Sequence, residues 1–397
     1  MAIDYQQIQP KIKEIGAGAR TRREQLEKLR QQTRALLTRH GGQLETLRGI
    51  VDSAKTTAPN LRCASPLGEP LSSHIPAPES DSIKGAVLIA ADGSQIIPDR
   101  HSALQFGLIN VGAIVMRMGS GAPPEIHTTS DLLYGDELDT GFGPMTEGML
   151  ALKRDLRERS MLEELSGDER GTVVTFTDGP IELWGARDGE DAQAYIQALK
   201  SYQSVLSRLQ SRGVITAGYV DKPSADLVVR LLELVKAQEE RPESLRGYRP
   251  LRGVSDRWLF GEPANSLLGP GERSAVFAIE SRSGEHYQGV LSLHFFYLNV
   301  GTVKHPWPVR VEIPKWVADD PVKLGLLHAV LVEQCRAMGG KPYPYLLHRA
   351  HEVAVVRQEE QAQVEAMLVQ ELRRQEGELD EVSSKQSAKE LKGRTRY

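Results

Sequence analysis

Two short segments of the chain each present an aspartate after a run of apolar residues. Residues 87–94 (VLIAADGS) and 173–180 (VVTFTDGP) contain Asp92 and Asp178, and glycine follows both. Each segment predicts a buried strand that ends at its aspartate, where glycine turns the chain. Asp-Gly is also common in simple turns, in which the aspartate caps its own loop. Two such segments favour a pair of carboxylates at one edge of a sheet, and such pairs bind hard divalent cations such as Mg²⁺ or Mn²⁺.

A third carboxylate is expected from the charged helix at 153–165 (KRDLRERSMLEEL). Most of its charges are expected to form a solvated face. We favour Glu158, because Arg154 and Arg157 lie on the same turn and can reach a phosphate. The pattern alone does not choose among the acidic residues of this helix, which are Asp155, Glu158, Glu163 and Glu164.

A histidine pair lies near the C-terminus, in YLLHRAHEVAVV (345–356). His348 and His351 are three residues apart and therefore share one face of a helix. His351 stands beside Glu352, which suits a proton carrier or, with a neutral ring, a metal ligand. We favour His351 over His348 as a site residue, although a single histidine is more often structural.

Three basic residues are candidates for contacts with nucleic acid. Lys222 follows the predicted strand at 214–220 and is placed to hold a phosphate, although it also suits a capped loop before proline. Arg257 belongs to a loose cluster of arginines between 246 and 257, which suits contacts with a phosphate backbone. Arg310 alternates with apolar residues in VRVEIP, so it lies on the polar face of a strand.

The elements that would position these residues follow the order β-β-β-α-β-α-β-α. This order predicts an α/β fold with a ribonuclease H-like mixed sheet, in which three antiparallel strands are followed by right-handed crossovers to parallel strands. Helices flank the sheet. The expected strands are 87–91, 104–111, 113–118, 172–177 and 214–220, and the expected helices are 145–165, 192–209 and 224–237.

Further elements extend this core at both ends. The pattern predicts a helical segment at 1–53 and a linker rich in proline and serine at 54–84. Added strands are expected at 275–280, 289–298 and 309–313, followed by helices at 321–338 and 346–372. Residues 357–397 read as a charged tail, helical at first and disordered from Gln375 onward.

Composition excludes several classes of protein. The 397 residues carry a formal net charge of −4, and only two are cysteines, Cys63 and Cys335. This composition argues against a disulfide framework and against a zinc cluster, and it fits a reducing cytoplasm. No run approaches the about 18 apolar residues of a membrane span, and the N-terminus lacks the pattern of a secretory signal. Neither a P-loop nor an HExxH motif occurs.

Taken together, six segments resemble the NurA family of DNA-repair nucleases, in the order found in that family. The resemblance implies a nuclease domain at 85–356 with its ribonuclease H-like core at 85–240. It also implies Mn²⁺-dependent, or Mg²⁺-dependent, hydrolysis of DNA, with 5′-to-3′ exonuclease activity at double-strand breaks and single-strand endonuclease activity. The segments are ADGSQ (91–95), TDGPIELW (177–184), YVDKP (219–223), DRWLF…LLGPGERS (256–274), RVEIP (310–314) and PYPYLLHRAHEVA (342–354).

The same resemblance implies site residues and partners. The metal-site aspartates correspond to Asp92 and Asp178, the helix glutamate falls within 153–165, and the C-terminal histidine corresponds to His351. The implied partners are DNA ends, a second copy of the chain and a hexameric HerA-type helicase. The chain departs from the family at Pro180, where serine often stands.

Two other functions remain open at this stage. The first is a nucleotide-binding protein of the actin and sugar-kinase type, which shares this strand order, although glycine-rich phosphate loops are sparse here. The second is a non-catalytic adaptor of a DNA translocase, in which both Asp-Gly pairs are only turns.

Overall fold

The computed structural model of the chain describes residues 3–99, 102, 104–139, 143–185, 191–263, 265–340 and 342–375. These residues form two units, each built from two stretches of the chain. Unit 1 comprises Met1–Pro78 and Val220–Ala318, and unit 2 comprises Glu79–Tyr219 and Asp319–Tyr397. Each unit is described by itself.

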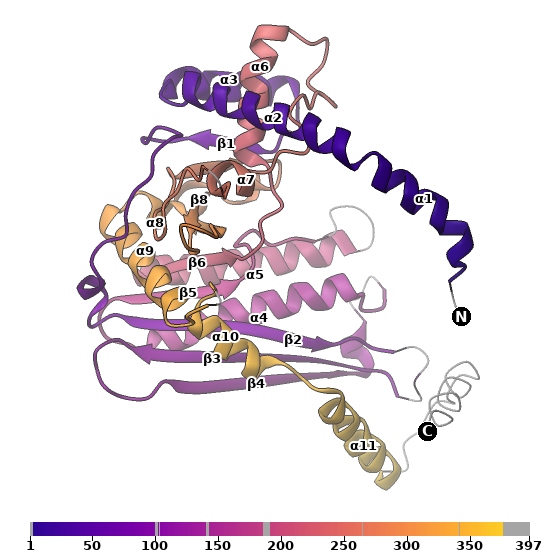
Figure 1. Ribbon diagram of the computed structural model, residues 1–397. Coiled ribbons are helices and arrows are strands. Elements are labelled where there is room, and N and C mark those ends of the chain that lie inside the picture. Colours follow the sequence, from indigo (N-terminus) through magenta and orange to yellow (C-terminus); the bar gives the residue numbers. More distant parts are fainter. Residues whose placement is uncertain are drawn as a thin grey trace. The chain divides into compact units, whose positions relative to one another are not determined.

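Unit 2 contains a mixed sheet in which β3 is antiparallel to both β2 and β4, while β5 is parallel to both β2 and β6. The spatial order of its strands is β6-β5-β2-β3-β4 (Figure 1). This order and these directions confirm the predicted ribonuclease H-like plan. The bounds are β2 Val87–Ile96, β3 Phe106–Arg117, β4 Glu125–Tyr134, β5 Val173–Asp178 and β6 Ile215–Val220.

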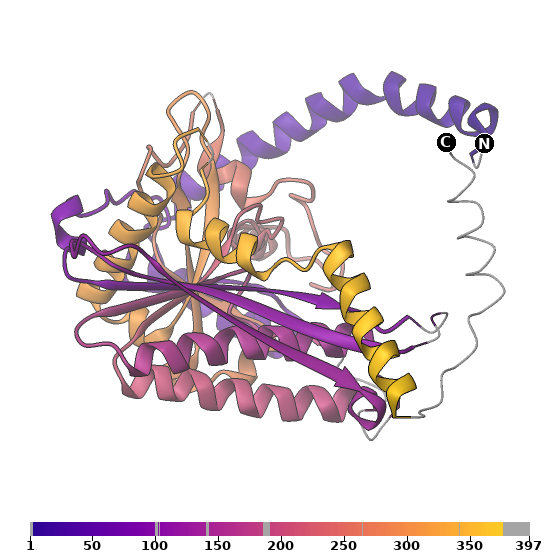
Figure 2. The same ribbon diagram turned by 90° about the horizontal axis from the view of Figure 1, so that it is seen from below.

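Helices cover both faces of this sheet. Figure 2 shows α4 and α5 side by side on one face and α10 on the other. The side of α4 that faces the sheet buries Met149, Leu152 and Leu162, as its apolar spacing predicts. The helices of unit 2 are η1 (Ser80–Ile83), η2 (Gly135–Leu138), α4 (Glu147–Gly167), α5 (Asp191–Ser211), α9 (Pro321–Arg336), α10 (Tyr345–Ala354) and α11 (Gln358–Arg374).

The second strand of the sheet differs from its prediction. The strands expected at 104–111 and 113–118 are one continuous strand, β3, which runs through Gly112. The third antiparallel strand is β4, which the sequence analysis missed. It was missed because β4 lies at the edge of the sheet and buries only Leu133, so its sequence lacks the apolar alternation of a strand.

The C-terminal helix also differs from its prediction. The single helix expected at 346–372 is two helices, α10 and α11, separated at residues 355–357. One face of α11 packs, through Val364 and Leu368, on a small apolar cluster that includes Ile96 and Phe106. The disorder is predicted from Gln375 onward; Gln375 caps α11, and residues 376–397 lie outside the described residues.

Unit 1 contains an antiparallel sheet and the N-terminal helices. The order β1-β7-β8-β9 includes the three added strands that the sequence predicts, and β1 lies within the predicted linker and pairs with β7. The elements are α1 (Tyr5–Ala17), α2 (Ala19–His40), α3 (Leu44–Thr57), β1 (Cys63–Pro66), α6 (Leu227–Glu240), α7 (Asp256–Gly261), β7 (Phe277–Glu280), η3 (Gly284–His286), η4 (Gly289–Leu291), β8 (Leu293–Asn299), β9 (Pro308–Pro314) and α8 (Lys315–Ala318).

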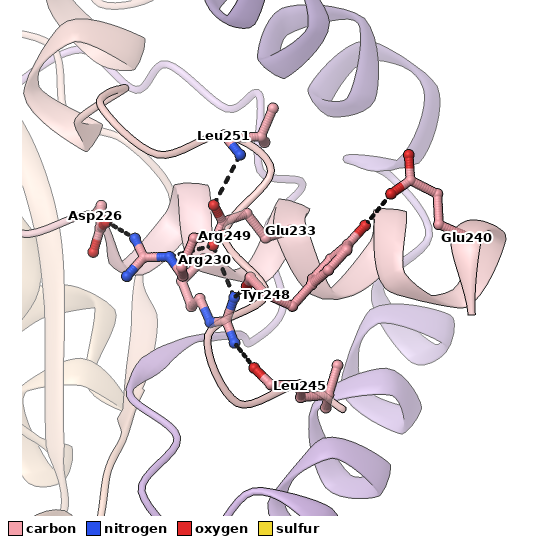
Figure 3. Close-up of polar contacts among 8 residues, drawn as sticks. All are labelled: Asp226, Arg230, Glu233, Glu240, Leu245, Tyr248, Arg249 and Leu251. Carbon is pink, nitrogen blue, oxygen red and sulfur yellow. Dashed lines mark hydrogen bonds and ion pairs between the residues drawn. The ribbon is translucent and has the colours of Figure 1, made fainter. Parts of the chain in front are cut away.

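A buried ion-pair network joins α6 to the loop that follows it (Figure 3). Glu233 is fully buried and accepts hydrogen bonds from Arg230 at 2.9 Å and from Arg249 at 2.7 Å. It also accepts one from the backbone N–H of Leu251 at 3.0 Å. A buried carboxylate of this kind is stable only while its partners are in place. The contacts of Glu233 therefore hold the arginine-rich loop against α6.

None of the helices in the described part of the chain is long and apolar enough to cross a membrane.

Candidate active site

The two aspartates singled out by the sequence lie next to each other on neighbouring strands. β2 and β5 run parallel, with Ala91 opposite Thr177. Asp92 and Asp178 are the next residues along these two strands, so they lie side by side at this edge of the sheet. The side chain of Asp92 is 15 % exposed, whereas Asp178 is exposed. The structure therefore places the two predicted carboxylates next to each other in unit 2.

The two glycines that follow the aspartates play different parts. Gly179 has a φ of 92° and turns the chain, as predicted. The turn predicted at Gly93 is wrong, because β2 continues to Ile96. At Gly93 an added Cβ would lie 2.6 Å from Oε1 of Glu158 and 2.7 Å from Cγ of Arg154. Glycine is needed here because α4 brings these two side chains against the strand.

Two of the four candidate acidic residues at 153–165 are neutralised away from the aspartates. Glu163 pairs with Arg212 at 2.8 Å and with Arg208 at 3.2 Å. Glu164 pairs with Arg157 at 2.7 Å. These ion pairs leave Asp155 and Glu158 as the helix carboxylates nearest the site.

Glu158 is a buried carboxylate in acidic surroundings, with a side chain that is 8 % exposed. Burial raises its pKa well above the ordinary value, and the charges of Asp155 and Asp92 add to this rise. Burial likewise raises the pKa of Asp155. Arg154 lies against both, with Nη2 2.8 Å from Oδ1 of Asp155 and Nε 3.4 Å from Oε1 of Glu158.

A second arginine of α4 is structural. Arg159 is 1 % exposed and donates to the hydroxyls of Thr177 at 2.7 Å and Thr216 at 2.9 Å. It therefore ties α4 to β5 one residue before Asp178, and to β6. The sequence analysis missed this role, because an arginine within a charged helix reads as part of a solvated face.

The C-terminal histidine reaches the same edge of the sheet. Nδ1 of His351 lies 2.7 Å from Oδ2 of Asp92. His348 instead faces Glu352, with 3.6 Å between Nε2 and Oε1. The structure thus brings together Asp92 and His351, the histidine that the sequence analysis favoured.

The helix that carries His351 is anchored to the sheet by polar contacts and a glycine. The carbonyl oxygen of Ala354 accepts hydrogen bonds from Ser94 at 2.5 Å and from Asn110 at 2.7 Å. At Gly112 an added Cβ would lie 2.9 Å from the carbonyl oxygen of Ala350. Gly112, which the sequence analysis interpreted as a break between strands, gives α10 the room to approach β3.

Two of the predicted basic residues lie against the ring of one tryptophan, Trp307, in unit 1. The Arg257 guanidinium lies 4.3 Å from the ring centre of Trp307, and Nζ of Lys222 lies 5.6 Å from it. Nε1 of Trp307 donates to Asp221 at 2.9 Å. Cations held on an aromatic ring in this way lose little further freedom when they bind a phosphate. The sequence analysis missed Trp307, since a lone tryptophan gives no signal of its cationic neighbours.

The third predicted basic residue lies inside unit 1. Arg310 is 7 % exposed and pairs with Glu312 at 2.9 Å. Nearby, the hydroxyl of Tyr297 donates to Asp256 at 2.8 Å, and Asp256 also accepts from two N–H groups in the first turn of α6. Burial raises the pKa of Asp256 to about 7. Arg310 therefore belongs to this buried network, and we do not propose it as a contact with DNA.

The donor set at the sheet edge suits a hard divalent cation. Asp92, Asp178, Asp155 and Glu158 offer carboxylate oxygens, the preferred ligands of Mg²⁺ and Mn²⁺. Burial and the neighbouring charges of Asp155 and Asp92 disfavour the ionised form of Glu158 and raise its pKa, and a bound cation would relieve this. As they stand, no three His, Cys, Asp or Glu side chains among the described residues are arranged to hold a metal ion.

The sequence of this chain matches the model of a known protein family. Residues 86–356 match the model of the NurA domain, whereas a search of curated proteins finds no match. Among solved structures, the NurA nuclease from Sulfolobus solfataricus is 11% identical, with 94% of this chain and 98% of that chain covered and a TM-score of 0.49. The catalytic domain of human Endonuclease V is 11% identical, with 70% and 87% covered and a TM-score of 0.30.

Proposed function

Because the chain belongs to the NurA domain family, we propose that it is a metal-dependent nuclease that hydrolyses phosphodiester bonds in DNA. The observation that carries this proposal is the meeting of carboxylates from separate segments. Asp178 ends β5, Asp92 lies beside it within the parallel strand β2, and Glu158 reaches β2 at Gly93 from α4. Several carboxylates in close proximity repel one another, and their presence at one site favours a functional reason such as cation binding.

In the proposed reaction Asp92, Asp178 and Glu158 would hold the cation. A divalent cation bound there would activate water and stabilise the negative charge of the leaving oxygen. Asp155 lies on the same face of α4, where it adds negative charge to the site. Arg159 ties α4 to β5, and β5 pairs with β2, so the spacing of the three proposed ligands is set by the packed fold.

His351 is the proposed proton carrier. The carboxylate of Asp92 accepts a hydrogen bond, so Nδ1 of His351 carries the proton in their 2.7 Å contact. In the neutral ring Nε2 is then the atom that takes up a proton or binds a cation. The ring is 61% exposed, which leaves it accessible to substrate.

Lys222 and Arg257 are the proposed phosphate contacts. Both lie against Trp307 in unit 1. Contacts of this kind release counterions from DNA, so affinity for DNA is expected to fall as salt rises.

The finer features of the activity rest on the family resemblance. We propose Mn²⁺ as the preferred cation, with Mg²⁺ as the alternative. We also propose 5′-to-3′ exonuclease and single-strand endonuclease activity on DNA ends in double-strand-break resection, in the cytoplasm. The proposed partners are a second copy of the chain and a HerA-type hexameric helicase.

The experiment that tests the nuclease uses end-labelled single- and double-stranded DNA with Mn²⁺, Mg²⁺ or EDTA. Asp178→Asn keeps the size of the side chain but removes its charge, so we expect metal-dependent cleavage to be lost while DNA binding persists. The control is Asp131→Asn, which changes an exposed aspartate of β4 that lies 3.5 Å from Arg157. Full cleavage by Asp178→Asn would refute the assigned site. If the wild type cleaves no DNA, with or without a hexameric ATPase partner, the adaptor is the better function.

A further inference from the structure

Arg154 of α4 contacts both of the helix carboxylates that lie near Asp92. Its guanidinium contacts the carboxylates of Asp155 at 2.8 Å and of Glu158 at 3.4 Å. Its aliphatic part lies against Gly93, next to Asp92, whose charge also acts on Arg154. The side chain is 31 % exposed, so it is only partly enclosed.

The negative charges near the Arg154 guanidinium come from three carboxylates, and a second arginine, Arg159, acts on two of these. Asp92, Asp155 and Glu158 all act electrostatically on Arg154. Arg159 also acts on the two helix carboxylates. The two arginines differ in their freedom, because Arg159 is 1 % exposed and donates to threonine hydroxyls, whereas Arg154 reaches solvent. Arg154 is therefore the cation that can leave the carboxylates without disrupting the interior.

A guanidinium and a divalent cation compete for the same carboxylate oxygens. Both are attracted by the negative charge of Asp155 and Glu158, and both cannot bind one carboxylate oxygen closely. A phosphate of DNA offers an alternative partner, since arginine binds phosphate through paired N–H donors. Arg154 would thus pair first with the neighbouring carboxylates and then with a phosphate of the substrate.

We propose that Arg154 is a displaceable counter-ion, which holds the helix carboxylates until a divalent cation replaces it and a DNA phosphate receives its guanidinium. This inference rests on the proposed function, because it takes a metal and DNA as the ligands. Its consequence is positive coupling, in which DNA strengthens metal binding by drawing Arg154 away from the carboxylates.

The first measurement is Mn²⁺ affinity of the full chain without DNA, by titration calorimetry or by the electron paramagnetic resonance of free Mn²⁺. Arg154→Met removes the competing charge and keeps much of the apolar stem. We expect Arg154→Met to bind Mn²⁺ about tenfold more tightly than the wild type, a difference of about 1.4 kcal/mol.

The matched control is Arg157→Met, on the next turn of the same helix. Arg157 pairs with Glu164 and Asp131, not with the site carboxylates, so its affinity for Mn²⁺ is expected to equal that of the wild type. Arg154→Lys keeps the charge and is expected to bind Mn²⁺ as weakly as the wild type. Thermal unfolding in EDTA checks that each variant is folded.

The second measurement repeats the titration with a phosphorothioate oligonucleotide that resists cleavage. DNA should tighten Mn²⁺ binding by the wild type but have little effect on Arg154→Met, because that variant has no guanidinium to withdraw. Equal or weaker Mn²⁺ binding by folded Arg154→Met without DNA would overturn the proposal, as would equal coupling in both proteins. These readouts do not require cleavage, so the proposed function can fail in the nuclease assay while the role of Arg154 stands.

Discussion

Replacing Glu158 by glutamine is expected to stabilise the metal-free protein. The carboxylate is 8 % exposed and stands near Asp155 and Asp92, and both burial and these charges raise its pKa. A carboxyl group with a raised pKa in the folded state destabilises that state when it is ionised. Glu158→Gln keeps the shape and removes the charge, so the free energy of unfolding at pH 7 should increase.

The magnitude follows from two opposing effects. A buried polar or charged group that is poorly paired costs a fold about 1–3 kcal/mol. Against this stands the lost contact with Arg154, at 3.4 Å and partly exposed, which is worth less than about 1 kcal/mol. The net expectation for Glu158→Gln is an increase on the order of 1 kcal/mol in the free energy of unfolding.

Glu163→Gln is the matched control on the same helix. The Glu163 side chain is 9 % exposed, almost the same as Glu158, but it pairs with Arg208 and Arg212. Both arginines are about half exposed, so each pair contributes at most about 1 kcal/mol. Glu163→Gln should therefore lower the free energy of unfolding on the order of 1 kcal/mol, the opposite sign from Glu158→Gln.

The assay is denaturant unfolding in EDTA at pH 7 and at pH 5. As pH falls, wild-type Glu158 takes up a proton in the folded state, so its penalty disappears and the advantage of Glu158→Gln should shrink. The same substitution should abolish metal-dependent cleavage. If Glu158→Gln lowers stability as much as Glu163→Gln does, Glu158 is not an uncompensated charge and the assignment of the site loses its electrostatic support.

Two further predictions concern the buried network of unit 1. Glu233→Gln should lower the free energy of unfolding by about 3 kcal/mol, because it removes the buried negative charge that Arg230 and Arg249 share; denaturant unfolding measures this, and a change below about 1 kcal/mol would contradict it. Asp256 has a pKa of about 7 in the folded state, so wild-type stability should fall as pH rises from about 4 to 7, by up to about 1.4 kcal/mol per pH unit. Asp256→Asn should flatten this part of the stability profile, and an unchanged slope would show that Asp256 does not titrate there.

Part of the site was predictable because local patterns and sheet geometry act together. Apolar runs predicted the strands that carry Asp92 and Asp178, and the crossover between these parallel strands places the two residues side by side. The pattern of YLLHRAHEVAVV likewise favoured His351, which lies 2.7 Å from Asp92. Long, strongly patterned elements such as α4 and α9 were predicted for the same reason.

Other features of the fold could not be read from local pattern. β4 carries mostly exposed polar residues, so only its pairing with β3 makes it a strand. Gly112 resembles a break in the sequence, yet it lies within β3 where α10 approaches closely. Both features depend on contacts with segments far away along the chain.

The sequence by itself determined the two strands that carry Asp92 and Asp178 and the helices α4 and α5 that follow β4 and β5, because burial of apolar runs and chain connectivity leave few alternatives. Only the tertiary structure decided which charges of α4 meet at the site. Glu158 and Glu163 lie on one helix and are equally buried, but one faces Asp92 and the other faces two arginines of the segment 208–212. The physical reason is that the electrostatic state of a carboxylate depends on its neighbours in space, which the spacing of charges along a helix does not specify.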